Sequence, residues 1–202
     1  MAQNTRERLL EAARGLFAER GYHNATVRDI AARAHTNLAS INYYFRSKDD
    51  LYREVLSHSF RKTIETEEPG EEATTREDRL RAFIRSLVPK SVEDGNGAQH
   101  MRLVAWEMLS PTGALDQIEE TEIKPHLDRA KDAVRPFLAP DTSPADLGAT
   151  ALWLVGQCLI FRGLAERMRL GLMPVPTDGD HAERLVALIC DLALKGLSSM
   201  PL

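Results

Sequence analysis

The sequence predicts an all-α protein with about nine helices. Apolar side chains recur at three- and four-residue spacing, helix-capping residues recur along the chain, and the alternating pattern of strands is almost absent. The capping pairs are Asn4-x-x-Glu7, Thr26-x-x-Asp29, Ser47-x-x-Asp50 and Thr75-x-x-Asp78, and Ser143-Pro144-Ala145-Asp146 adds a proline in the first turn.

The elements follow from these patterns in chain order. Leu9, Ala13, Leu16 and Phe17 share one face of the first helix, and Gly21 can take the left-handed conformation that ends a helix. Later helices are separated by turn-forming residues, among them Pro69-Gly70, Gly95 to Gly97, Pro111 to Gly113, Pro140 to Pro144 and Pro174 to Gly179. The expected helices span residues 4–20, 27–34, 38–44, 48–67, 74–90, 97–110, 113–138 (bent near Pro125), 144–171 and 181–198.

Two of these helices form the pattern of a helix-turn-helix. Helices 27–34 and 38–44 are short and are joined by about three residues. Ile30, Ala31 and Ala34 of the first helix are expected to face Ile41 of the second. Glycine is usual in such a turn because the backbone is left-handed there, whereas this sequence has His35, a residue type enriched at positive φ.

The second short helix has a polar face without an acidic side chain. Asn37 is placed to cap it, and the side chains expected on its exposed face are Thr36, Asn37, Ala39, Ser40, Asn42 and Tyr43. A helix in the major groove of DNA needs such groups toward base edges and hydrogen-bond donors toward phosphates. Donors to phosphates are expected from Thr26, Arg28, Tyr43, Tyr44 and Lys48, the last at the start of a helix, where an anion is favoured. Phe45 and one of the tyrosines are expected to pack inside this domain.

The charges suggest that only the N-terminal part meets a polyanion. The chain has 26 Lys and Arg against 30 Asp and Glu, for a formal net charge of −4. Residues 1–66 contain 11 basic against 8 acidic residues, and the other 136 contain 15 against 22. A basic N-terminal part followed by an acidic remainder favours nucleic-acid binding by the N-terminal part, although so small an excess of basic residues also arises by chance.

Composition favours a cytoplasmic protein that needs no membrane partner and no cofactor. No apolar run reaches the roughly 18 residues of a membrane span. The N-terminal segment is amphipathic and contains acids, which indicates a folded helix and not a signal peptide. Cys158 and Cys190 lie in apolar helical stretches and are expected to be reduced core thiols in preference to a disulfide.

Residues 26–56, TVRDIAARAHTNLASINYYFRSKDDLYREVL, resemble the N-terminal domain of the TetR family of bacterial transcriptional regulators. The similarity runs from about Arg6 to Leu56 and is most specific in the Tyr-Phe-x-Ser-Lys-x-x-Leu run from Tyr44 to Leu51. Asn42 stands where most members have tyrosine. NLASINYYF is similar to the CecR-like subgroup instead, and LIFRGLAERM in the penultimate helix is consistent with it.

The resemblance implies two domains. Residues 1–47 would be a three-helix DNA-binding domain, and residues 48–202 a helical domain that binds a small-molecule effector and forms a twofold homodimer. The dimer would bind double-stranded palindromic operator DNA, and members of this family are most often repressors. Helices 144–171 and 181–198 are expected to form the dimer interface because the first is apolar on several sides and contains Gly148, Gly156 and Gly163. The alternative is that both helices are buried within one chain.

A small, largely apolar effector is expected because methionine and aromatic side chains line adaptable apolar pockets. The candidate residues are Phe83, Leu87, Met101, Val104, Trp106, Met108, Trp153, Gln157 and Phe161. Each apolar member of this set is also explained by simple core packing.

Other classes of protein fit the sequence less well. An enzyme could use Cys158 with His126 and Asp128, but no nucleophile motif surrounds Cys158, and the sequence has no Gly-rich phosphate loop, His-Glu-x-x-His or Cys-x-x-Cys. A helical small-molecule-binding or interaction protein without DNA binding would not need Asn37, Tyr43 and Lys48 together. The six histidines show no metal-ligand spacing. We therefore expect a ligand-responsive transcription factor and not an enzyme.

Overall fold

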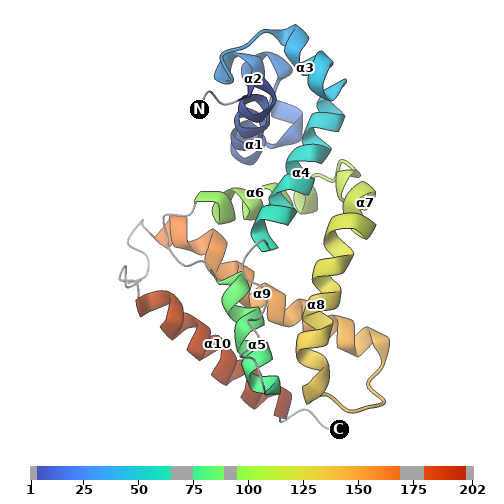
Figure 1. Cartoon of the computed structure of the whole chain (residues 1–202), viewed down its shortest axis with the longest axis vertical. Helices are drawn as coiled ribbons and strands as arrows, with labels where there is room; N and C mark the ends of the chain where they lie inside the picture. The colour runs from blue at the N-terminus through green and yellow to red at the C-terminus, as the bar shows by residue number, and fades with distance from the viewer. Residues whose placement is uncertain (1–3, 65–74, 89–94, 169–179, 199–202) are drawn as a thin grey trace. The chain divides into compact units, whose positions relative to one another are not determined.

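A computed structural model describes the chain except for residues 1–3, 65–74, 89–94, 169–179 and 199–202 (Figure 1). The described residues form helices and no strand, which confirms the predicted all-α class. The elements are α1 (Thr5–Asn24), α2 (Val27–Arg33), α3 (Leu38–Phe45), α4 (Lys48–Ile64), α5 (Arg76–Leu87), α6 (Gly95–Leu109), α7 (Ala114–Ile118), η1 (Glu119–Ile123), α8 (Lys124–Val134), η2 (Arg135–Phe137), α9 (Pro144–Met168) and α10 (Asp180–Ser198). The continuous run from α7 to η2 corresponds to the single helix predicted over 113–138. The predicted ends of three helices, at residues 67, 90 and 171, and the predicted start at residue 74 lie outside the described residues.

The predicted capping residues begin the helices that the sequence assigned to them. Asn4, Thr26 and Asn37 accept backbone N–H groups at the starts of α1, α2 and α3. The same contact is made by Ser47 at α4, by Thr75 at α5 as part of a capping box, and by Ser143 at α9. Each cap satisfies a helical N–H that would otherwise lack a partner, which is why these short patterns were informative.

Gly21 interrupts α1 as predicted. Its backbone is left-handed, with φ 73° and ψ 169°, so regular helix stops there and Tyr22 to Asn24 turn toward α2. A Cβ at this position would also lie 2.9 Å from Cδ2 of Trp106, whose indole Nε1 donates to the Ala18 carbonyl at 3.2 Å. Glycine therefore allows both the turn and the close approach of α6.

The irregularity predicted near Pro125 is the π-helical segment η1, Glu119–Ile123. Proline has no amide hydrogen, and its ring would clash with the carbonyl of Thr121 in a regular helix. A widened π-helical turn just before the proline relieves this conflict without ending the helical run.

The chain divides into two compact units. The first consists of residues Met1–Lys62 with Gln99–Glu122, and the second of Thr63–Ala98 with Ile123–Leu202. The boundary predicted between residues 47 and 48 divides the chain by function, whereas these two units divide it by packing. The predicted boundary therefore stays a prediction. No helix among the described residues has the length and apolar composition that crossing a membrane requires.

Each unit has its own apolar core. In the first unit, α1 to α4 and the second half of α6 supply fully buried side chains, which include Leu9, Leu16, Phe17, Ile30, Ile41, Leu51, Leu56 and Leu103. In the second unit, α5, α8, α9 and α10 pack around a cluster that includes Leu80, Ile84, Val134, Leu154 and Ile189. Cys158 and Cys190 are buried in this cluster and are not joined by a disulfide, as expected.

Candidate nucleic-acid interface

The helix-turn-helix has the packing that the sequence predicted. Ile30, Ala31 and Ala34 of the α2 segment are at most 5% exposed, and Ile41 of α3 is 1% exposed. His35 has φ 49° and takes the left-handed position in the turn. The amides of His35 and Thr36 donate to the carbonyls of Ala32 and Ala31 at 3.1 and 3.0 Å. The turn is thus closed by backbone hydrogen bonds, although it lacks the usual glycine.

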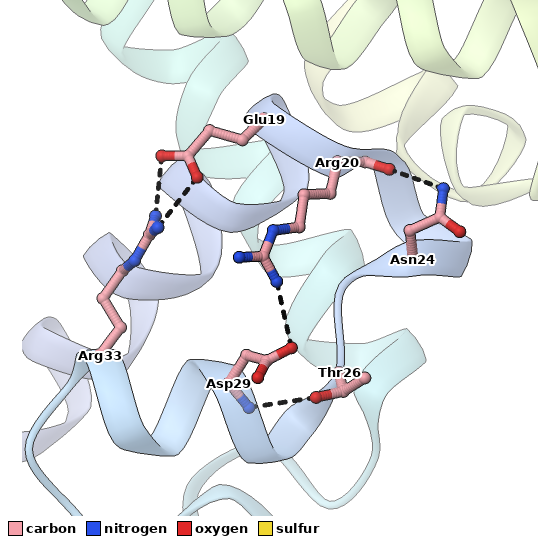
Figure 2. Close-up of polar contacts among 6 residues, drawn as sticks. All are labelled: Glu19, Arg20, Asn24, Thr26, Asp29 and Arg33. Atoms are coloured by element: carbon pink, nitrogen blue, oxygen red, sulfur yellow. Dashed lines mark hydrogen bonds and ion pairs between the residues drawn. The ribbon is translucent and has the colours of Figure 1, made fainter.

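Figure 2 shows the ion pairs that fix α2 against α1. Arg33 donates through both terminal nitrogens to the two carboxylate oxygens of Glu19, at 2.9 Å each. These hydrogen bonds lower the pKa of Glu19 and raise the pKa of Arg33. A two-point contact of this kind restrains orientation as well as distance, so α2 is held at a defined angle.

A second set of contacts in Figure 2 fixes the start of α2. Arg20 contacts Asp29 at 3.2 Å, and the Asp29 amide donates to Thr26 Oγ1 at 3.1 Å. Asn24 donates to the Arg20 carbonyl at 3.1 Å. Thr26 therefore caps α2 through its oxygen and keeps its hydroxyl hydrogen available to a phosphate. Arg28 on the same helix is exposed.

The first turn of α3 is ordered by its own side chains. Asn37 Oδ1 accepts the Ser40 amide and the Ser40 hydroxyl, both at 3.0 Å, and the Thr36 and Ser40 hydroxyls lie 3.0 Å apart. These three predicted base-reading residues thus support each other in the free protein. The side-chain amide nitrogen of Asn37 is the donor that this arrangement leaves toward solvent.

The remaining face of α3 is open to solvent. Ala39, Asn42 and Tyr43 are exposed, and Tyr43 is 81% exposed. Phe45 is buried and Tyr44 half-buried, with the Tyr43 and Tyr44 rings edge-to-face at 4.9 Å. As expected, Phe45 and one of the tyrosines pack inside this domain, and the other tyrosine is exposed. The helix contains neither an acidic nor a basic residue.

Leu38 is an exposed residue that sequence reasoning missed. It is 49% exposed although helical spacing places it on the side of Ile41 and Phe45. Its position next to the cap Asn37, at the first residue of the helix, is the feature that could have indicated exposure. An exposed leucine at this point adds an apolar group that can contact a thymine methyl.

The turn from α3 to α4 brings Lys48 next to Tyr22. Arg46 has φ 62°, and its amide donates to the Asn42 carbonyl at 3.2 Å. Lys48 Nζ lies 4.2 Å from the centroid of the Tyr22 ring, and burial lowers the pKa of Lys48. The Tyr22 hydroxyl donates to Asp49. Neither the left-handed Arg46 nor the contacts of Tyr22 were predicted.

The effector candidates fall in both compact units. In α6, Met101, Val104 and Trp106 are half-buried, and Met108 is 78% exposed. In the second unit, Phe83 and Leu87 pack in the core cluster, while Trp153 and Gln157 are exposed. The side chain of Phe161 lies outside the described residues. The structure thus brings Phe83 and Leu87 together and places Trp106 against α1.

Two hollows in the first unit are lined mostly by residues that are not effector candidates. A groove of about 430 Å³ is bounded by the end of α3, by α4 and by α7, with Arg46, Arg53 and Gln117 among its lining residues. A smaller pocket of about 90 Å³ is lined by Trp106, Tyr52 and Glu107 with residues 20–24. Trp106 is the one effector candidate that these two hollows include.

The packing, the capped α3 and its exposed face define a helix-turn-helix DNA-binding protein. Comparison with known proteins identifies its family. The model of the bacterial regulatory proteins of the tetR family matches residues 9–55. The model of the C-terminal domain of the HTH-type transcriptional dual regulator CecR matches residues 76–197. The chain belongs to the TetR family, in the group with the CecR C-terminal domain, as its resemblances predicted.

Individual relatives agree with this assignment. The chain is 30% identical to the HTH-type transcriptional dual regulator CecR of Shigella flexneri over 216 residues, which cover 99% of this chain and 96% of the relative. It is 32% identical to the HTH-type transcriptional repressor Rv3405c of Mycobacterium tuberculosis, over 70% of this chain and 62% of that one. These are transcriptional regulators, so the prediction that the protein is a DNA-binding regulator and not an enzyme is confirmed.

Solved structures share the fold. The fatty acid degradation regulator FadR from Bacillus halodurans has a TM-score of 0.69 at 19% identity, with 94% of this chain and 98% of that chain covered. A transcriptional regulator from Rhodococcus sp. RHA1 has a TM-score of 0.66 at 18% identity, with 98% and 100% covered. At this identity the likeness concerns the fold alone.

Proposed function

We propose that this cytoplasmic protein is a repressor that binds a palindromic operator as a homodimer and responds to a small, largely apolar effector. The observation that carries the DNA-binding part is the face of α3, which is exposed, lacks acids and begins with an ordered cap. In this proposal, residues 1–47 are the DNA-binding domain and residues 48–202 the effector-binding and dimerisation domain. The matches of the two family models to residues 9–55 and 76–197 support such a division.

The contacts with DNA divide into two kinds. Thr36, Asn37, Leu38, Ala39, Ser40 and Asn42 face the base edges, whereas Thr26, Arg28, Tyr43, Tyr44 and Lys48 contact phosphates. A phosphate contact contributes to affinity for every sequence and makes it salt-dependent, whereas a base contact changes the preference between sequences. This difference provides the test of the proposed function.

The test uses single substitutions in the full chain. Lys48→Ala should weaken binding to all duplexes and reduce the slope of log affinity against log salt by about 0.9 for one lost phosphate contact. Asn37→Ala should change discrimination between the operator and a scrambled duplex by roughly 1–3 kcal/mol. Lys62→Ala, which removes an exposed lysine near the end of α4, is the matched control and should have no effect. If Lys48→Ala matches the parent at every salt concentration, the proposed interface is wrong.

Exposed apolar side chains support dimerisation through α9 and α10. Leu152 on α9 is 64% exposed, and Leu188 and Leu192, one turn apart on α10, are 54% and 58% exposed. Exposed apolar patches of this kind mark protein interfaces. Leu188→Arg should yield monomers in light scattering, because it buries an unpaired charge. Leu109→Arg, at a 79% exposed leucine in the first unit, is the control and should remain dimeric. A monomeric parent chain at micromolar concentration would refute the proposal.

The effector is proposed to act through the spacing of the two α3 helices. In a dimer this spacing must match about one turn of DNA, roughly 34–36 Å, or a multiple of it. An effector changes it only by binding one arrangement more tightly, and DNA must then weaken effector binding by the same factor. Val104→Trp should abolish the response and retain most DNA binding. A variant that still responds fully would place the effector elsewhere.

A second candidate is a regulator that also activates transcription. The relative CecR is described as a dual regulator, and it covers nearly the whole chain. Reporter genes with the operator placed either over or upstream of a promoter distinguish the two candidates. A pure repressor lowers expression from the first and leaves the second unchanged.

A further inference from the structure

Tyr22 joins the end of α1 to the first turn of α4. Its hydroxyl donates to the Asp49 carboxylate, and Lys48 Nζ lies 4.2 Å from the centroid of its ring. Within the described part of the chain, no oxygen accepts a hydrogen bond from Lys48 Nζ. One side chain therefore holds the two charged residues that begin α4, one positive and one negative.

The Tyr22 ring is held in place by two buried aromatic side chains. Its centroid lies 5.0 Å from that of Tyr52 and 6.1 Å from that of Phe17, and both of these residues are at most 1% exposed. Phe17 and Tyr52 also pack edge-to-face at 4.8 Å. Burial and the Asp49 hydrogen bond raise the pKa of Tyr22 to about 12, so its hydroxyl remains a donor at neutral pH. Because Tyr22 follows the left-handed Gly21, the chain turn itself directs this ring toward α4.

We propose that Tyr22 is a positioning residue for DNA binding, which holds the Lys48 ammonium ready for a phosphate and restrains the Asp49 carboxylate beside it. This inference rests on the proposed phosphate contact of Lys48. A lysine side chain loses rotamer freedom when it binds, and a side chain that is already held in place loses less. The ring face occupies one side of the ammonium, which leaves N–H donors toward solvent.

The hydrogen bond to Asp49 has a separate role. A carboxylate next to Lys48 would repel a phosphate that approaches the start of α4. The Tyr22 hydroxyl occupies one of its acceptor positions and restrains it at the α1 side. Tyr22 thus contacts both of the oppositely charged side chains that begin α4.

Six variants separate these roles in the full chain. Tyr22→Leu removes the ring and the hydroxyl, whereas Tyr22→Phe keeps the ring under Lys48 and releases Asp49. Each is measured alone and combined with a partner substitution, Tyr22→Leu with Lys48→Ala and Tyr22→Phe with Asp49→Asn, and the two partner substitutions are also measured alone. Phe137→Leu is the matched control, because it removes a ring 4.9 Å from the Arg76 guanidinium in the second unit. The probe is a fluorescent mixed-sequence duplex, titrated at several salt concentrations, since the phosphate contribution does not depend on sequence.

Tyr22→Leu should weaken binding about two- to fivefold per DNA-binding head, which corresponds to an exposed cation–π contact. When Lys48 is already alanine, it should cause only the smaller loss that the released Asp49 carboxylate produces, because the effect of the ring passes through Lys48. Tyr22→Phe should cause a smaller loss that disappears with Asp49→Asn. Phe137→Leu should bind like the parent.

Four results would overturn the inference. Tyr22→Leu could bind like the parent, or could lose the same factor with and without Lys48, as a general packing defect would. Tyr22→Phe could lose the same affinity whether residue 49 is Asp or Asn, which would exclude the role of the hydroxyl. If Lys48→Ala itself binds like the parent, the proposed phosphate contact fails and this inference falls with it. The Lys48→Ala result therefore distinguishes the two failures.

Discussion

A buried hydrogen bond between α4 and α6 should contribute measurably to stability. Tyr52 is 1% exposed and donates to Glu107 Oε1 at 2.8 Å, and Glu107 is 3% exposed. Tyr52→Phe removes only the hydroxyl and retains the ring against Phe17. Because a hydrogen bond to a carboxylate contributes about 1.5–3 kcal/mol, the variant should lose that much free energy of unfolding. Glu107 keeps its contacts with the Thr112 amide and hydroxyl, at 3.2 and 2.9 Å, which limits the loss.

The assay must report on the first unit alone, because the two units can unfold in separate steps. The chain has two tryptophans, of which Trp106 lies in the first unit and Trp153 in the second. In a Trp153→Phe background, Trp106 is the remaining tryptophan, and its fluorescence reports the unfolding of the first unit. For a slope of about 2 kcal/mol per molar urea, the midpoint of Tyr52→Phe should fall by about 1 M.

The matched control is Tyr43→Phe, the same chemical change at a side chain that is 81% exposed. It should change the free energy of unfolding by less than about 0.5 kcal/mol. If Tyr52→Phe and Tyr43→Phe unfold at the same urea concentration, the bond between α4 and α6 does not stabilise the protein.

Three further predictions concern the same unit. Gly21→Ala should lower the free energy of unfolding by more than about 1 kcal/mol, because residue 21 has φ 73° and a Cβ would lie 2.9 Å from Trp106. Urea unfolding measures this loss, and a midpoint equal to that of the parent would contradict the prediction. Tyr22 should titrate near pH 12 and not near its ordinary pKa of 10.0, so its contribution to the stability of the fold is complete below pH 10 and is lost as the pH rises toward 12. The difference in tyrosinate absorbance between the parent and Tyr22→Phe measures this pKa, and identical titration curves for the two would contradict the prediction. The pKa of Glu19 is lowered by Arg33 from 4.5, so their pairing stabilises the fold above that pH and is lost below it; thermal unfolding of Glu19→Gln should therefore depend less on acid than that of the parent.

Local features of this fold could be predicted from the sequence because they depend on few neighbouring residues. The caps at Thr26 and Asn37 need only a side-chain oxygen and an amide three residues later. His35 could be assigned the left-handed turn position because the two short helices already required it there. The left-handed Arg46 was missed because arginine is not a residue type that marks this conformation.

Contacts between distant residues could not be predicted in the same way. Lys48 was expected to contact phosphate, but its support by Tyr22 depends on how α1 packs against α4. Trp106 was considered an effector contact, yet its indole donates to Ala18 and fills the space left by Gly21. Helical spacing shows which side chains share a face, but not which other helix that face meets.

The contacts of α4 connect DNA binding to α6 within one compact unit. In its first turn, Lys48 and Asp49 contact Tyr22 of α1. One turn later Tyr52 bonds Glu107 of α6, and further along Ser59 bonds His100 at 2.7 Å. The part of α6 from Gln99 onward therefore belongs to the same unit as α1 and α4. An effector that contacts Met101 or Val104 would act directly on this unit, and a shift of α6 would reach the phosphate contact of Lys48 through Tyr52 and Tyr22.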